Sequence, residues 1–130
     1  MEPAAHTLTF FLAGYPPLPN KTISWNWHQR GREAKVWRSA ANYAARAAYA
    51  DSMLGGSMKP VRIDVTFFYR QRRVRDRMNM VASLKPVVDG LVDACIIPDD
   101  GPEWLPDTPF VHEMVHKSGP MGIEVTVTEL

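Results

Sequence analysis

The segment from Val61 to Tyr69 constrains the fold most strongly, because its side chains alternate in character. The odd-numbered positions are apolar or aromatic, and positions 62, 64 and 66 are polar. This alternation is typical of a strand with one buried face. The chain must therefore build a sheet that packs one face against a core. Its 130 residues, of which 45% are hydrophobic, fit one domain spanning residues 1–130.

Two helices are predicted between the strands. Residues 33–51 are rich in alanine and other good helix formers, and Gly55 and Gly56 follow as a stop signal. The stripe expected to face the core from this helix consists of Val36, Ala40, Tyr43 and Ala47. A second helical stretch covers residues 79–94, and Pro86 inside it predicts a kink or a restart. Its expected apolar face consists of Met80, Leu84, Val87, Val88, Leu91, Val92 and Cys95.

The remaining segments complete the predicted order β-α-β-α-β-β. Residues 7–13 form a strand, and the three prolines in residues 15–20 argue against a helix there. Residues 21–32 are polar and aromatic and are predicted to be a loop. Residues 110–117 and 121–128 alternate on either side of Ser-Gly-Pro, which predicts a β-hairpin. The expected fold class is α+β, with a mixed four-stranded sheet and two main helices.

Charge is unevenly distributed along the chain, although the formal net charge is only +1. Residues 1–88 carry a balance of +9 and residues 89–130 a balance of −8. The arginine segment, residues 70–77 with the sequence RQRRVRDR, holds five arginines around Asp76. Halves this polarised are typical of nucleic-acid or metal functions, but a fold can also interleave the two charges in space.

The sequence lacks signals for membrane insertion or export. It contains no run of about 18 apolar residues. Its first residues lack the basic and apolar regions of a signal peptide. The single cysteine, Cys95, cannot form an intrachain disulfide, which suits a reducing compartment. We therefore expect a cytoplasmic protein with no membrane partner.

Residues 112–116 read HEMVH and match the zinc-peptidase pattern H-E-x-x-H. That chemistry needs both histidines on one face of a helix. The neighbouring residues alternate as in a strand, where two histidines four residues apart would lie about 13 Å from each other. We therefore treat a zinc peptidase as a remote alternative, and two histidines on a sheet surface as the expected outcome.

Three aspartates flank the second helical stretch and are candidates for chemistry. Asp76 lies in the arginine segment before the helix, and Asp99 and Asp100 lie in the loop after it. They can meet only if the helix returns toward the strand or the loop folds back. A carboxylate cluster of this kind would suit a hard cation such as Mg²⁺, and arginines around it would hold phosphates. Asp-Asp-Gly is also a common turn, and arginine runs are usually solvated surfaces.

Three motifs resemble the RusA family of Holliday junction resolvases, of the phage or prophage type. PPLPN at residues 16–20 looks like the family's N-terminal proline–asparagine motif. RRVRDRMN at residues 72–79 is similar to its arginine-rich Arg-Asp-x-Asp-Asn motif. LKPVVDGLVDACIIPDD at residues 84–100 resembles its helix and acidic loop. The last two occur in the family's order and spacing, and the resemblance extends from about residue 8 to the C-terminus.

The resemblance implies a magnesium-dependent endonuclease, with Mn²⁺ as a substitute and no organic cofactor. Such an enzyme acts as a homodimer and cuts opposite strands of four-way DNA symmetrically, in recombination and repair. A phage-encoded protein of this type would work in the cytoplasm of a bacterial host. The implied catalytic residues are Asp76, Asp100 and Lys85. The implied metal ligands are Asp76 and Asp100, assisted by Asp99 or Asp89. The expected DNA-binding residues are Arg70, Arg72, Arg73, Arg75, Arg77, Asn79, Arg30 and Arg32.

One departure from the family pattern is Met78, which stands where the motif has a second aspartate. A thioether is a poor ligand for Mg²⁺. Either Asp89 or Asp99 completes the site, or the site has a variant geometry, or the protein is a weakened or non-catalytic junction binder. Asp89 lies four residues after Lys85, so a simple surface salt bridge between them is an equally good interpretation. We expect the remaining acids, Glu113 among them, to lie away from bound DNA.

Overall fold

The protein is described by a computed structural model that covers residues 6–50 and 59–130. The predicted glycine stop at residues 55 and 56 lies outside the described residues. The order β-α-β-α-β-β is confirmed for the main elements; the second helical stretch is divided into two helices, and a short helix that was not predicted precedes the first. In chain order the elements are β1 (Thr7–Ala13), α1 (Pro19–Thr22), α2 (Trp27–Tyr49), β2 (Val61–Tyr69), α3 (Arg77–Ser83), α4 (Lys85–Asp93), β3 (Phe110–Val115) and β4 (Gly122–Glu129).

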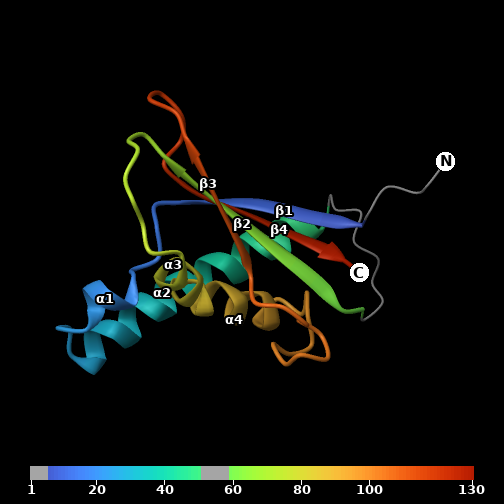
Figure 1. Ribbon diagram of the computed structural model, residues 1–130. Coiled ribbons are helices and arrows are strands. Elements are labelled where there is room, and N and C mark those ends of the chain that lie inside the picture. Colours follow the sequence, from blue (N-terminus) through green and yellow to red (C-terminus); the bar gives the residue numbers. More distant parts are fainter. Residues whose placement is uncertain (1–5, 51–58) are drawn as a thin grey trace.

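The four strands form one mixed sheet in the order β1-β4-β2-β3 (Figure 1). β4 runs antiparallel to β1 and to β2, whereas β2 and β3 are parallel. The expected hairpin between the last two strands is therefore wrong, because β2 lies between them. The difference in burial between β3 and β4 explains this strand order. Ile123, Val125 and Val127 of β4 are fully buried, whereas β3 has no fully buried residue and forms an edge of the sheet. Alternation alone does not identify a strand's partner.

The helices cover one face of the sheet (Figure 1). The alternation in β2 is confirmed, since its odd-numbered residues from Val61 to Phe67 are buried against this layer. α4 supplies Val87, Val88 and Leu91 to the same core, as expected.

α2 and α4 pack at very close range. A methyl group on Gly90 would lie 2.5 Å from the carbonyl oxygen of Arg38 and 2.7 Å from Cβ of Ala41. Ala41 and Ala45 are therefore the buried residues of α2. The predicted stripe is wrong, because Val36 and Tyr43 are 60% and 82% exposed. Only small side chains fit against α4, so the larger ones lie on the outside.

α2 begins six residues earlier than predicted. Asn26 caps it, because its side-chain oxygen accepts a hydrogen bond from the backbone N–H of Gln29 at 2.9 Å. The expected loop over residues 21–32 is thus largely helical. The proline segment also contributes a short helix, since Pro19 occupies a first-turn position where its missing N–H costs nothing.

The predicted restart at Pro86 is confirmed. α3 ends at Ser83, α4 begins at Lys85, and Pro86 lies in the first turn of α4. The expected burial of Cys95 is wrong: it follows the helix with φ +60° and is exposed. Within the described parts of the chain, no helix has the length and apolar character needed to cross a membrane.

Candidate functional site

The first turn of α4 carries a cluster of charged side chains, the Lys85 cluster, which we define as Lys85, Asp89, Asp99 and Asp100. Nζ of Lys85 lies 3.0 Å from Oδ1 of Asp89 and also donates a hydrogen bond to Asp100. Oδ1 of Asp99 accepts the backbone N–H of Asp100 at 2.8 Å. The loop after α4 therefore folds back to the start of that helix, which is one of the two arrangements the sequence required.

Opposite charges hold Lys85 and Asp100 in their ionised forms. Hydrogen bonds to Asp100 and then Asp89 raise the pKa of Lys85. The same ammonium group lowers the pKa of Asp100. The Lys85 side chain is 61% exposed, so solvent screens the interaction and the cluster remains open to an incoming ligand.

Asp76 lies apart from the Lys85 cluster, at the opposite end of α3. Its Oδ1 caps that helix by accepting the N–H of Met78 at 2.9 Å, and its Oδ2 accepts from the side-chain amide of Asn79 at 3.0 Å. A helix the length of α3 spans about 10 Å. Asp76 and Asp100 thus belong to different hydrogen-bonded groups. Their separation in the sequence did not show whether the two aspartates would meet in the fold.

The donor chemistry of the Lys85 cluster suits a hard cation, although the carboxylates are not assembled as a closed metal site. Asp89 and Asp100 already direct oxygens at one positive group, and carboxylate oxygens are the ligands Mg²⁺ prefers. Within residues 6–50 and 59–130, no three His, Cys, Asp or Glu side chains are grouped closely enough to hold a metal ion.

Arg75 differs from the other members of the arginine segment because its guanidinium is packed inside the fold. It lies 3.4 Å above the centre of the Tyr69 ring and 3.6 Å from the carboxylate of Glu113. It also donates to the carbonyl oxygens of Arg73 and Gln71, both at 3.2 Å. Arg75 therefore holds the segment in shape. Glu113 lies beside the arginine segment through this ion pair, and its position relative to bound DNA stays a prediction.

The other predicted DNA-binding residues are more open. Arg72 and Arg77 are exposed and make no ion pair within the described chain. Arg70 donates to the carbonyl oxygen of Gly119, and Arg73 to the side chain of Gln71. Arg32 is exposed on α2.

Arg30, in contrast, is used locally. Its Nε donates to the carbonyl oxygen of Trp25 at 3.0 Å, and one terminal nitrogen donates to that of Ile23 at 2.9 Å. These bonds tie the first turn of α2 to the end of α1. They leave part of the guanidinium available to an outside ligand.

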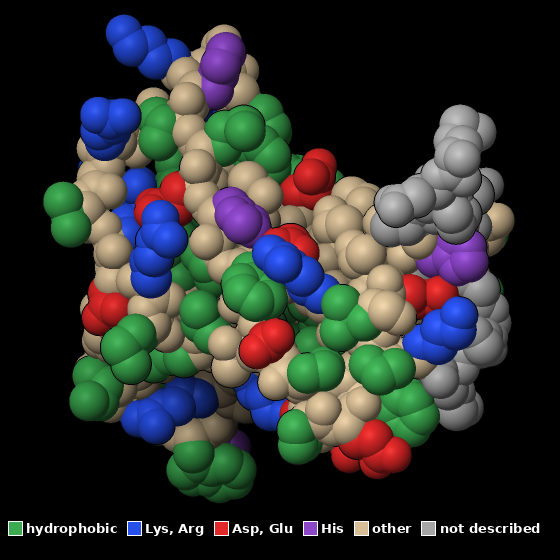
Figure 2. Space-filling model, turned by 45° about the vertical axis from the view of Figure 1, so that its right-hand side comes forward, with side chains coloured by type: hydrophobic (Ala, Val, Ile, Leu, Met, Phe, Trp, Pro, Cys, Tyr) green, Lys and Arg blue, Asp and Glu red, His purple; other side chains and the backbone are tan. Residues whose placement is uncertain are grey.

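The opposite charges of the two sequence halves meet in space. Arg38 pairs with Asp93, Arg75 with Glu113 and Lys85 with Asp100. Figure 2 shows basic side chains along the left-hand margin of the face drawn, with acidic side chains scattered among them. The charge split in the sequence is therefore partly neutralised by folding, and the residual positive charge belongs to the exposed arginines.

The HEMVH segment forms strand β3 up to Val115, so the strand prediction is confirmed and the helix needed for zinc chemistry is not formed. His112 instead lies 2.9 Å from Oδ1 of Asp64 on the neighbouring strand. His116 follows the strand and lies against Ser118.

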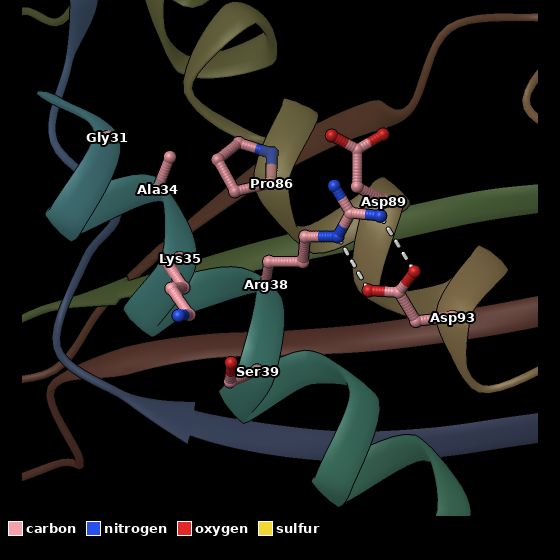
Figure 3. A pocket seen from close by; sticks show the side chains of 8 residues that line it. All are labelled: Gly31, Ala34, Lys35, Arg38, Ser39, Pro86, Asp89 and Asp93. Atoms are coloured by element: carbon pink, nitrogen blue, oxygen red, sulfur yellow. Dashed lines mark hydrogen bonds and ion pairs between the residues drawn. The ribbon is translucent and has the colours of Figure 1, made fainter. Parts of the chain in front are cut away.

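Among the described residues, three open hollows surround the first turn of α4. One of about 340 Å³ adjoins Lys85 and Asp100. A second, of about 440 Å³, lies between α2 and α4. In it, Arg38 donates two hydrogen bonds to Asp93, at 2.6 and 2.8 Å, with Asp89 above the guanidinium (Figure 3). Sequence reasoning missed Arg38, because nothing in its helical spacing indicates a partner 55 residues away.

The third hollow, of about 160 Å³, lies where α1, α2, α3 and α4 meet. Trp25, Arg30, Glu33 and Trp37 line it together with Pro86. It shares Ala82 with the hollow at Lys85, so the two are adjacent.

Comparison of the chain with models of known protein families gives no match, and comparison with curated proteins gives none either.

Proposed function

We propose that this protein is a magnesium-dependent endonuclease of the Holliday junction resolvase type, which binds branched DNA and cuts it at the Lys85 cluster. The observation that carries the proposal is the order of charges along α3 and α4. Exposed arginines precede α3, and a solvent-accessible lysine with three aspartates follows at the start of α4. In the sequence, the motifs that resemble the RusA family place the arginines, the lysine and the acidic loop in this same order.

The arginine segment provides the DNA-binding part of this function. Arg72 and Arg77 are exposed, and Arg73 is exposed with one bond to Gln71. Guanidinium groups bind phosphates in a planar, two-pronged manner, and each neutralised phosphate contributes to the salt dependence of binding. Arg70 and Arg32 extend the basic surface, and Asn79 orients Asp76 through its side-chain amide.

The Lys85 cluster provides the hydrolytic part. Asp100, Asp89 and Asp99 would hold one cation, and Asp76, which caps the far end of α3, would hold a second. When bound, Mg²⁺ supplies Lewis-acid polarisation of the phosphoryl group and a more acidic water. Lys85 meanwhile balances two carboxylates and presents an ammonium group to a phosphate oxygen, where negative charge grows during hydrolysis.

Symmetric cutting of a four-way junction needs two equivalent sites, and a homodimer with two-fold symmetry supplies them. Within this proposal the protein acts in recombination and repair, in the cytoplasm of a bacterial host if a phage encodes it.

A second candidate is a junction-binding protein with weak or no cleavage. Asp76 is engaged in capping α3, and Met78, which replaces a motif aspartate, has a side chain 83% exposed beside it. Neither fact affects how the arginines would bind phosphates. A protein of this second kind would therefore bind junctions with the same affinity but would not cleave them.

The test is incubation of the protein with a synthetic four-way junction and Mg²⁺, beside Asp76→Asn. Asparagine is as good a helix cap as aspartate, so this variant keeps α3 and removes only the charge. Paired symmetric nicks that disappear in the variant support the endonuclease.

Tight junction binding without cutting, at any Mg²⁺ or Mn²⁺ concentration, favours the second candidate. Met78→Asp then tests whether position 78 limits the activity. A protein that binds no junction at all contradicts both.

A further inference from the structure

We propose that the hollow between Trp25 and Trp37 is a binding site for a single unpaired nucleobase next to the cut site. This inference rests on the proposed DNA-binding function and specifies which feature of branched DNA the protein recognises.

The size of the hollow suits one planar ring. Its volume of about 160 Å³ lies below the roughly 300–1,000 Å³ of pockets for drug-sized ligands. The lining combines two indoles with the rings of Pro17, Pro19 and Pro86. Flat, rigid and mostly apolar walls are what a nucleobase needs for stacking, and aromatic side chains are the usual platform.

The position of the hollow suits a base attached to the reacting strand. It shares Ala82 with the hollow that contains Lys85 and Asp100, and Pro86 is the next residue after Lys85. A phosphate bound at Lys85 would therefore bring a neighbouring nucleotide to this opening. Branch points provide such nucleotides, because their bases are the least stacked and the easiest to turn outward.

The polar groups of the hollow suit a base with an exocyclic amine. Thr22 and Ser83 both donate to nearby carbonyl oxygens, and Arg30, which also lines the hollow, donates to those of Trp25 and Ile23. Glu33 is half-buried and makes no hydrogen bond within the described residues. A carboxylate only accepts. Guanine offers an N–H and an amine side by side, whereas thymine flanks its single N–H with two carbonyl oxygens that a carboxylate repels. Guanine should therefore bind best and thymine worst.

Trp27 provides a matched control. It lies two residues after Trp25, is 75% exposed and does not line the hollow; its ring stacks on His28 instead. Replacing Trp25 removes a wall of the hollow, whereas the carbonyl that accepts from Arg30 belongs to the backbone and survives the change.

The experiment measures binding to four-way junctions with one extra nucleotide at the branch point, in EDTA to prevent cutting. The extra nucleotide is guanine, thymine or an abasic site. Fluorescence anisotropy gives each Kd, and thermal melting verifies that each variant is folded. We expect guanine to bind at least about fivefold tighter than the abasic site, in line with measured base–aromatic stacking. Trp25→Ala should abolish this ratio, Trp27→Ala should keep it, and Glu33→Gln should reduce the preference for guanine over thymine.

Equal affinity for guanine and the abasic site in the unaltered protein would overturn the base site and leave the proposed DNA binding intact. A ratio that survives in Trp25→Ala would also overturn it. Failure to bind any of these junctions would overturn the proposed function, and the base site with it.

Discussion

The arginine segment and the Lys85 cluster lie at opposite ends of α3 and carry their charge in opposite ways. Apart from Arg75, the arginines point outward with few partners of opposite sign. In the cluster the ammonium group of Lys85 contacts two carboxylates, those of Asp89 and Asp100. Unpaired surface charge is available to a polyanion, whereas paired charge is held in place. The comparison therefore separates a region suited to affinity from a region suited to chemistry.

The largest expected effect comes from breaking the cluster. Lys85→Met removes the ammonium group that would face the phosphate, and loss of one such stabilising group typically slows a reaction by about 10²–10³-fold. Single-turnover cutting of a four-way junction with excess protein measures the rate, and anisotropy measures binding. Lys117→Met is the control, because Lys117 is exposed in the turn before β4. Unchanged cutting by Lys85→Met would contradict the division between the two regions.

The next effect concerns Arg75, the packed member of the arginine segment. Arg75→Ala removes the contacts with Tyr69 and Glu113 and two bonds to backbone carbonyls. A partly exposed ion pair contributes up to about 1 kcal/mol, so amide exchange in residues 70–76 should become about fivefold faster. Hydrogen-exchange mass spectrometry without DNA measures this. Arg72→Ala should leave the exchange rates unchanged. Equal exchange rates in the two variants would show that Arg75 stabilises the segment no more than the exposed arginines do.

A smaller effect is expected from an open arginine. Arg72→Ala removes one charge available to a phosphate, so the slope of log affinity against log salt should become shallower by about 0.9. Between 50 and 200 mM salt this corresponds to about a 3.5-fold change in the ratio of affinities. A salt titration of junction binding measures the slope. A slope unchanged from that of the unaltered protein would show that Arg72 contacts no phosphate.

The smallest effect is on stability as a function of pH. The lowered pKa of Asp100 means that its contribution is present above the ordinary aspartate pKa of about 4 and is lost as the pH falls through the folded value. The raised pKa of Lys85 means that its contribution is present below about 10.4 and is lost above the folded value. The Tm difference between the unaltered protein and Lys85→Met should be about 1–2 °C near pH 7. It should shrink as the pH falls through the folded pKa of Asp100, and a difference that stays constant with pH would show that the ion pairs do not stabilise the fold.

Local structure was predictable from the sequence where one physical rule dominates. The predictions of a half-buried strand at β2 and of a helix break at Pro86 were both correct. A half-buried strand requires alternating side chains, and proline lacks the N–H that a helix interior needs, so both features can be recognised in the sequence. The ion pair between Lys85 and Asp89 also followed from their spacing on one helix.

Long-range placement was not predictable. The turn signal before β4 indicated a hairpin, but β4 pairs with β1 and β2 because its buried face needs neighbours on both sides. The buried face of α2 was set by the close approach at Gly90, which lies about 50 residues further along the chain. The same limit applies to the site: the sequence places Asp76 before the helical stretch, but nothing in it places Asp100 beside Lys85.

The central position of β4 has a consequence for how the chain acquires its structure. Residues 122–129 are the last strand in sequence, yet they supply the backbone partners of both β1 and β2. Until they emerge during synthesis, β1 has no partner strand and β2 lacks its neighbour on one side, so open edges remain exposed. Contacts this distant in sequence also slow folding. A growing chain should thus depend on protection from association until residue 129 has been added, and a deletion that removes β4 should leave β1 unpaired and separate it from β2 and β3.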